Sequence, residues 1–117
     1  MHELSIVQSV VETVLDWLRA QPPLRVKAVN LRVGALSAVV EDALQFGWEI
    51  AAKDTQLEGS TLVVHEVNIV LYCMQCQKPE EVEGTQFFRC PNCGTPSNDL
   101  RQGREIEIES LEIEDEA

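Results

Sequence analysis

Two pairs of cysteines constrain this 117-residue chain more than any other feature of its sequence. Cys73 and Cys76 form one C-x2-C pair, Cys90 and Cys93 form the other, and 13 residues separate the pairs. Each pair suits a tight turn with both sulfurs facing one point, and a hairpin would bring the two turns together. Four thiolates around one ion make the closed tetrahedral coordination of a structural zinc site. The spacing therefore predicts zinc bound by all four cysteines.

Iron and disulfides are the alternatives to zinc. The run Cys90-Pro-Asn-Cys93-Gly94 is similar to a rubredoxin knuckle, but Gln77 follows the first pair where rubredoxins have glycine. Aromatic residues make up only 5% of the chain, and the aromatic core of rubredoxins is missing. Disulfides are disfavoured in the cytosol, where thiols stay reduced. We expect a closed zinc site, which leaves no position for substrate and so favours a scaffold over catalysis.

Apolar side chains spaced three and four residues apart predict two amphipathic helices that bury one face against a sheet. The first helix is expected to end before Pro22-Pro23, and Ser37 is expected to cap the second. The predicted stripes are Leu4, Val7, Val11, Val14, Leu15 and Leu18 in the first helix and Val40, Ala43, Leu44, Gly47, Ile50 and Ala51 in the second.

Three other segments have the patterns of strands. Alternation predicts a strand over residues 24–34, β-branched residues predict one over 61–72, and residues 106–113 predict the last. The last strand is too short and too charged to fold alone, so we expect it to join the sheet of the first domain. The predicted fold is therefore α+β, with two helices packed on a small three-stranded sheet and an inserted four-cysteine, zinc-ribbon-like subdomain.

Residues 73–103 differ in composition from the rest of the chain. They hold all four cysteines, three of the six glycines and three of the five prolines, which indicates a compact and turn-rich insert. Such an insert is too small to fold unaided, and metal binding supplies folding energy. We expect residues 73–103 to form the zinc-binding subdomain, and residues 1–72 plus 104–117 to form the α/β domain.

The charge and hydropathy of the chain exclude two classes of function. It has 9 basic against 20 acidic residues, a formal net charge of −11, whereas nucleic-acid binding needs clustered Lys and Arg. No segment approaches the roughly 18 apolar residues of a membrane span. The start Met1-His2-Glu3-Leu4 lacks the basic region of a signal peptide, so we expect a cytoplasmic protein without nucleic-acid or membrane partners.

His2 and Glu3 admit two interpretations. Composition alone favours an exposed histidine at a chain end. The chemistry allows a metal site, because imidazole binds nickel well and Ni(II) accepts square-planar sets of nitrogen ligands. The His2 ring, nearby backbone nitrogens and the Met1 amine can chelate one ion through small rings, with the Glu3 carboxylate in support.

The sequence resembles the HypA/HybF family of hydrogenase nickel-incorporation proteins over nearly its whole length. The matching features are Met1-His2-Glu3 before a helix, the Val33-Gly34-x-Leu-Ser37 turn, Gly59 before a strand that ends at Cys73, both cysteine pairs, and Gly103-x-Glu105 before an acidic strand. Two C-x2-C pairs occur in many proteins, but their combination with histidine at position 2 is specific.

The resemblance implies a nickel metallochaperone that is not an enzyme. It implies that His2 binds nickel as transient cargo with Glu3 beside it, and that zinc is bound by Cys73, Cys76, Cys90 and Cys93. The implied partners are a HypB-type GTPase and the large subunit of a [NiFe]-hydrogenase, with urease as a client in some organisms. Some members use an acidic ligand just after the Gly-x-x-Ser turn, where this chain has Val40, so the full ligand set stays open. Whether the chain forms a homodimer also stays open.

Two other functions fit the cysteine motif. A zinc-ribbon protein could act as an interaction adaptor without delivering metal, and an iron-loaded site could carry electrons as rubredoxins do. Hydrolysis is less compatible, because the sequence has no Ser-His-Asp grouping, no G-x-x-x-x-G-K phosphate loop and no metal site with an open position. We therefore predict no enzymatic activity.

Overall fold

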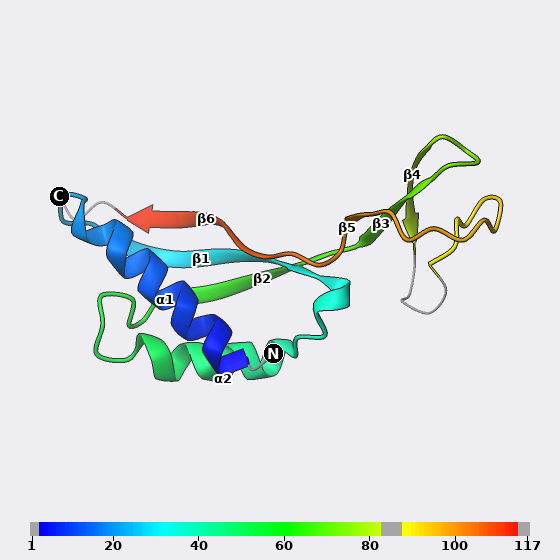
Figure 1. Cartoon of the computed structure of the whole chain (residues 1–117). Helices are drawn as coiled ribbons and strands as arrows, with labels where there is room; N and C mark the ends of the chain where they lie inside the picture. The colour runs from blue at the N-terminus through cyan, green and yellow to red at the C-terminus, as the bar shows by residue number, and fades with distance from the viewer. Residues whose placement is uncertain (1–2, 83–87, 115–117) are drawn as a thin grey trace. The chain divides into compact units, whose positions relative to one another are not determined.

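The computed structural model describes residues 3–82 and 88–114, so the predicted nickel ligand His2 lies outside the described residues. Two α-helices, one 3-10 turn and six strands form in this part of the chain (Figure 1). They are α1 (Glu3–Arg19), β1 (Arg25–Gly34), the 3-10 turn η1 (Ala35–Ser37), α2 (Glu41–Ala52), β2 (Thr61–Val67), β3 (Ile69–Cys73), β4 (Lys78–Val82), β5 (Leu100–Gln102) and β6 (Ile106–Glu114). The predicted α+β class is confirmed.

The elements form two compact units. The first unit comprises Met1–Leu31, Val39–Val64 and Ile108–Ala117, and the second comprises Arg32–Ala38 and His65–Glu107. The second unit therefore contains the cysteine-bearing insert expected at residues 73–103, together with flanking strand residues on both sides.

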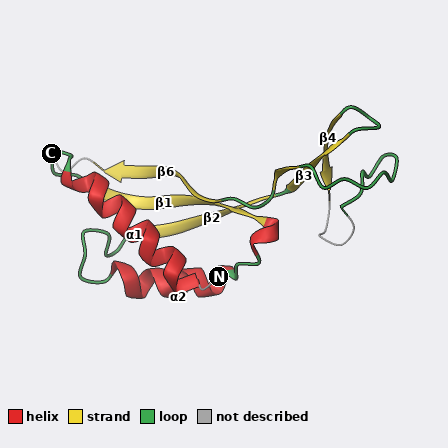
Figure 2. Cartoon of the chain, in the orientation of Figure 1, coloured by secondary structure: helices red, strands yellow, loops and turns green. Residues whose placement is uncertain are grey.

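Helix α1 begins with an acidic residue, Glu3, and ends with a basic one, Arg19, which suits both ends of the helix dipole. It packs against α2, and Figure 2 shows the two helices beside each other. They approach closely at Gly47, where a Cβ atom would lie 3.0 Å from Cγ2 of Val7. The buried side chains of α1 are Ile6, Val7, Val10, Val11, Val14 and Leu18. The predicted stripe is largely confirmed, but Leu4 is 43% exposed.

Helix α2 starts differently from the prediction. Its N-cap is Val40, and Ser37 lies instead in η1, where its hydroxyl donates a hydrogen bond to the Glu105 carbonyl. Ala38 has a φ of 56°, which turns the chain between η1 and α2. Val40 and Ile50, which the predicted stripe includes, are 58% and 52% exposed. The residues that α2 buries are Leu44, Gly47, Trp48 and Ala52.

The strands form two three-stranded sheets, with the orders β2-β1-β6 and β4-β3-β5. The run 61–72, predicted as one strand, is divided between the two sheets, with Asn68 at the break. The Asn68 amide donates to a Glu81 carboxylate oxygen over 2.7 Å, and the Asn68 carbonyl accepts from the Gln102 amide over 2.9 Å. These bonds satisfy polar groups where the chain leaves one sheet for the other.

Two motifs far apart in sequence meet in the second unit. The Gly34 N–H donates to the Glu105 carbonyl, and the Leu36 N–H donates to the Gly103 carbonyl, over 2.7 and 2.8 Å. A Cβ at Gly34 would lie only 2.2 Å from backbone atoms of Gly103, so this contact requires glycine. The Val33-Gly34-x-Leu-Ser37 and Gly103-x-Glu105 motifs are therefore two sides of one backbone contact.

Among the described residues, no helix is both long enough and apolar enough to cross a membrane.

Candidate metal centres

The first C-x2-C turn follows directly from β3. Alternate residues of this strand, Ile69, Leu71 and Cys73, are buried, so the pleat places the Cys73 sulfur on the inner side. The Gln77 N–H donates to the Cys73 carbonyl over 2.7 Å and closes the turn into β4. The Cys76 N–H points at the Cys73 sulfur over 3.4 Å. The turn therefore directs both the sulfurs and a backbone N–H to one point.

The second C-x2-C turn repeats this geometry. The Gly94 N–H donates to the Cys90 carbonyl over 2.9 Å, as Gln77 does to Cys73 in the first turn. Gly94 has a φ of 74° and Gln77 a φ of 56°, so both residues are in the left-handed region. Glycine is the residue that usually occupies it. Because Gln77 adopts the same conformation, its departure from glycine does not distinguish a zinc knuckle from an iron knuckle.

The four sulfurs converge. All lie within 4.8 Å of one another, with 3.5 Å between Cys73 and Cys93 and 3.8 Å between Cys76 and Cys90. Sulfurs about 2.3 Å from a tetrahedral zinc ion lie about 3.8 Å apart, whereas a disulfide brings two sulfurs to about 2 Å. The arrangement fits zinc. Within residues 3–82 and 88–114, no other group of three or more His, Cys, Asp or Glu side chains gathers in this way.

The sulfurs differ in their electrostatic surroundings. A hydrogen bond from the Thr95 hydroxyl, 3.1 Å away, is the main cause that lowers the pKa of Cys93 to about 6. The hydrogen bond with Cys93, followed by burial, raises the pKa of Cys76 to about 12. Without a cation, the thiolate form is therefore favoured at Cys93 and disfavoured at Cys76. A bound divalent cation would favour the thiolate form of its cysteine ligands.

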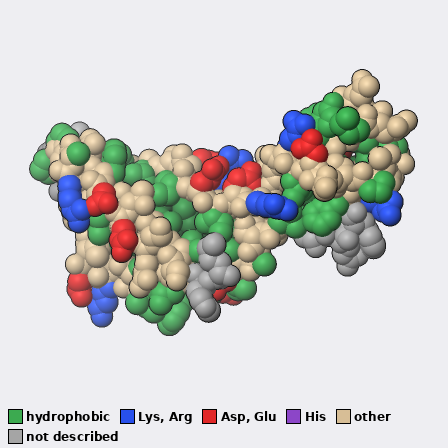
Figure 3. Space-filling model, viewed as in Figure 1, with side chains coloured by type: hydrophobic (Ala, Val, Ile, Leu, Met, Phe, Trp, Pro, Cys, Tyr) green, Lys and Arg blue, Asp and Glu red, His purple; other side chains and the backbone are tan. Residues whose placement is uncertain are grey.

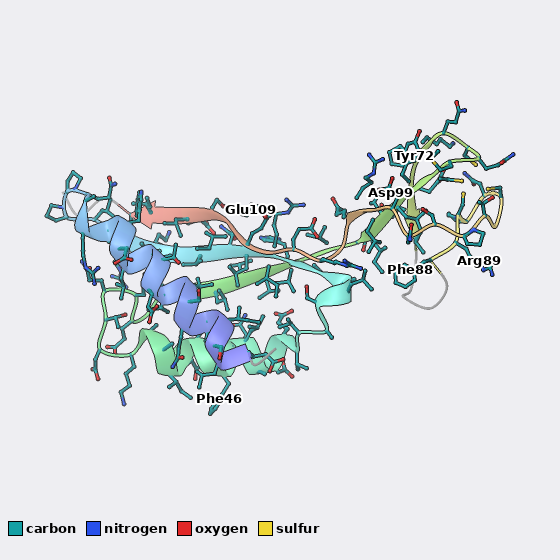
Figure 4. The ribbon with its side chains drawn as sticks, in the orientation of Figure 1. Phe46, Tyr72, Phe88, Arg89, Asp99 and Glu109 are labelled. Atoms are coloured by element: carbon teal, nitrogen blue, oxygen red, sulfur yellow. The ribbon has the colours of Figure 1, made fainter. Side chains whose placement is uncertain are left out.

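Polar contacts hold the two turns in place. The Asn92 amide, in the second turn, donates to a carboxylate oxygen of Glu80 on β4 over 2.8 Å. On the other side of β3, Arg101 forms two hydrogen bonds to Asp99, of 2.8 and 2.9 Å, and its guanidinium lies 4.6 Å from the centre of the Tyr72 ring. Tyr72 and Asp99 are labelled in Figure 4, near the yellow sulfur atoms. The second turn is therefore bonded to β4, and β5 contacts Tyr72, the residue before Cys73.

The described part of the predicted nickel site is Glu3. A Glu3 carboxylate oxygen accepts a hydrogen bond from the Val40 N–H over 3.3 Å. The structure therefore brings the Glu3 carboxylate to the backbone of Val40, whose side chain has no ligand atom. The sequence carries no signal for a contact between residues 37 positions apart. His65, the second histidine, is exposed and lies outside the cysteine cluster.

The comparisons with known proteins agree with this geometry. The family model described as hydrogenase/urease nickel incorporation, metallochaperone, hypA, matches residues 1–113. The chain belongs to this HypA family. It is 42% identical over 116 residues to the hydrogenase maturation factor HypA of Roseiflexus sp. (strain RS-1), covering 99% of this chain and 94% of the relative.

A second relative and a solved structure are also similar to this chain. The guanidine hydrolase-activating protein A of Synechocystis sp. is 34% identical over 114 residues, covering 96% of this chain and 94% of the relative. The solution structure of the Ni metallochaperone HypA from Helicobacter pylori shares the fold, with a TM-score of 0.68 at 20% identity, covering 99% of this chain and 100% of that one. The family is one of nickel metallochaperones for hydrogenase maturation, and the resemblance seen in the sequence is confirmed.

Proposed function

We propose that this protein binds Ni(II) through His2, with Glu3 beside it, and delivers the ion to the large subunit of a [NiFe]-hydrogenase. Zinc, bound by the four cysteines, is structural, and the protein is not an enzyme. The observation that carries the proposal is the match to the nickel-incorporation family over residues 1–113, a range that includes both candidate ligands. The expected compartment is the cytoplasm.

The proposal assigns the two metals to different parts of the chain. Residues 73–103 form the zinc-binding subdomain, and residues 1–72 plus 104–117 form the nickel-binding domain. Four thiolates close the coordination sphere of zinc, which suits a scaffold and not a cargo. A site with few protein ligands holds nickel firmly enough to acquire it and weakly enough to release it.

Glu3 supports the nickel site through its position. Glu3 is the first residue of α1. Its carboxylate accepts a hydrogen bond of 3.3 Å from the Val40 N–H. The carboxylate is therefore held next to the start of α2, directly after His2 in the chain. The His2 imidazole must be neutral to bind a metal ion, so nickel affinity should fall as the pH drops below the usual His pKa of about 6.5.

The proposed partners are a HypB-type GTPase and the hydrogenase large subunit. The sequence has no phosphate loop of its own, so energy for delivery would come from such a partner. The client is a separate question, because the family description also names urease and one relative is named for guanidine hydrolase. Sedimentation with and without nickel would decide between a monomer and a homodimer.

Nickel titration of the untagged full-length protein tests the proposal. We expect His2→Ala to weaken nickel binding at least tenfold, that is by about 1.4 kcal/mol or more. His65→Ala is the matched control, because His65 is the only other histidine. Equal nickel affinities of the wild type and His2→Ala would show that His2 is not a nickel ligand. Complementation of hydrogenase activity in cells that lack their own copy tests delivery separately from binding.

Metal analysis of the same samples tests the alternative functions. The proposal expects one zinc per chain and a colourless protein before nickel is added. A red protein with iron would indicate a rubredoxin-like electron carrier. One zinc without any exchangeable nickel would indicate a zinc-ribbon adaptor.

A further inference from the structure

The two cysteines of each C-x2-C pair differ in exposure. Cys73 and Cys90, the first members of the pairs, are 0% and 2% exposed. Cys76 is half-buried and Cys93 is exposed. A reagent dissolved in water therefore reaches the sulfur of Cys93 more readily than the other three. Cys93 is therefore the most exposed of the four cysteines.

The exposed sulfur also has a buried neighbour on the opposite turn. The Cys93 sulfur lies 3.5 Å from the Cys73 sulfur, and the remaining two sulfurs, of Cys76 and Cys90, lie 3.8 Å apart. Each close pair joins the two turns. A small inward movement of the Cys93 sulfur would bring it to the disulfide distance of about 2 Å from Cys73.

We propose that the four-cysteine zinc site is a modification site for hydroperoxides, with Cys93 as the point of attack and a Cys73–Cys93 disulfide as the first stable product. The proposal rests on the zinc site of the proposed function and adds an activity to it. Zinc is lost when this disulfide forms, because only two of the four ligands remain.

The chemistry balances with one hydroperoxide per disulfide. The Cys93 thiolate attacks one peroxide oxygen, the O–O bond breaks, and the departing oxygen takes a proton and leaves as water or an alcohol. Cys93 is then a sulfenic acid. The Cys73 thiolate attacks this sulfur, an S–S bond forms, and hydroxide leaves and takes a second proton. The two sulfurs are oxidised by two electrons in all, and the peroxide is reduced by two.

The disulfide would act on the second unit. Cys73 ends β3, the central strand of the sheet β4-β3-β5, so its sulfur connects the metal to that sheet. Loss of zinc removes the ion that holds the two turns together. The contacts between α1 and α2, including the bond between Glu3 and Val40, lie in the first unit and involve no cysteine. Oxidation should therefore loosen one unit and leave the other folded.

Treatment of the full-length, zinc-loaded protein with hydrogen peroxide tests this inference. Zinc is first counted per chain, then its release is followed with a chromophoric chelator while samples are blocked with N-ethylmaleimide for peptide mapping. We expect zinc to be released at the same rate as a disulfide-linked pair of peptides containing Cys73 and Cys93 appears. In the unoxidised protein, iodoacetamide should label Cys93 at least about tenfold faster than Cys73 or Cys90, because the accessible thiolate is the nucleophile.

Three variants sharpen the test. Met74 is 75% exposed and would be oxidised by the same reagent, so Met74→Leu removes that signal while keeping all four cysteines. Cys93→Ser and Cys76→Ser each remove the second cysteine of a pair, and we expect peroxide-driven zinc release to slow more in Cys93→Ser. If either variant no longer binds zinc, the labelling order in the wild type decides.

Several outcomes would overturn the inference. Equal labelling of the four cysteines, a first disulfide within one pair, or zinc release without any disulfide would each do so while leaving the structural zinc site intact. A chain that carries no zinc before peroxide is added would overturn the zinc assignment as well. The two failures are therefore distinguishable.

Discussion

The cysteine turns and the start of α1 are held by different kinds of contact. In the turns, backbone N–H groups close each C-x2-C loop over 2.7 to 2.9 Å, and four sulfurs converge within 4.8 Å. At the start of α1, the Glu3 carboxylate accepts a hydrogen bond of 3.3 Å from the Val40 N–H. A metal bound by the four sulfurs would join the two turns, whereas one at the start of α1 would bind to a helix that is already held by its packing against α2.

The surfaces of the two regions differ as well. Helix α2 exposes Phe46 and Ile50, at 67% and 52%, and Figure 3 shows hydrophobic side chains along the lower edge of this view. Phe46 is labelled at the same edge in Figure 4. The cysteine turns expose Met74 but bury Cys73 and Cys90. The difference is that the cysteine cluster buries one ligand of each turn and exposes Cys93, whereas α2 presents exposed apolar side chains.

The largest expected effect is loss of a buried zinc ligand. Cys90→Ser should abolish zinc binding and unfold the second unit, because structural zinc contributes about 10–16 kcal/mol of apparent binding free energy in small zinc domains. Hydrogen exchange should show fast exchange in β3, β4 and β5 and continued protection in α1 and α2. Protection that stays unchanged in β3 would show that the sheet does not depend on the metal.

The next effect is a backbone clash. In Gly34→Ala, the new Cβ would lie 2.2 Å from the Gly103 backbone, which cannot rotate away, so we expect a loss of more than about 3 kcal/mol in unfolding free energy. Gly47→Ala is the control. Its Cβ would meet a Val7 methyl at 3.0 Å, and the gain in helix propensity of about 1 kcal/mol offsets the crowding. Urea unfolding of both variants measures the difference, and equal stabilities would contradict the contact.

A smaller effect is expected at Glu3. Glu3→Gln removes a charge from the first turn of α1 and weakens the hydrogen bond to Val40, which should cost about 1 kcal/mol of stability. We also expect weaker nickel binding. Glu12→Gln, on the exposed side of the same helix, should change neither quantity. Thermal unfolding and nickel titration of both variants test this. Equal losses of stability and of nickel affinity in Glu3→Gln and Glu12→Gln would show that the Glu3 carboxylate contributes to neither through its contact with Val40.

The smallest effect concerns a surface pair beside the zinc turns. Hydrogen bonds from Arg101 hold the pKa of Asp99 below its usual value, so this pair stabilises the fold above the unfolded Asp pKa of about 3.9 and less as the pH falls through the folded pKa. Arg101→Gln should raise the pKa of Asp99 toward its usual value and barely change stability at neutral pH. Carboxyl titration by NMR measures the pKa of Asp99. An unchanged pKa in Arg101→Gln would show that Arg101 does not cause the low value.

Much of the fold followed from local patterns. The period of the apolar residues located α1 and the last strand to within a few residues, because burial of one face imposes that period. The start of α2 and the division of residues 61–72 were missed. Val40 became the N-cap because Ser37 bonds to Glu105, and Asn68 breaks the run through bonds to Glu81 and Gln102. Those partners are distant in sequence, so no local pattern reports them.

The sequence by itself determined the zinc ligands as candidates, since two C-x2-C pairs limit how four sulfurs can be arranged around one ion. It also determined the family, because its motifs extend along nearly the whole chain. Only the tertiary structure decided that Gly34 packs on Gly103, that Glu3 meets Val40, and that Cys93 is the exposed corner of the cluster. The reason is physical: spacing along the chain restricts local geometry, whereas burial and long-range contacts depend on which distant segments pack together.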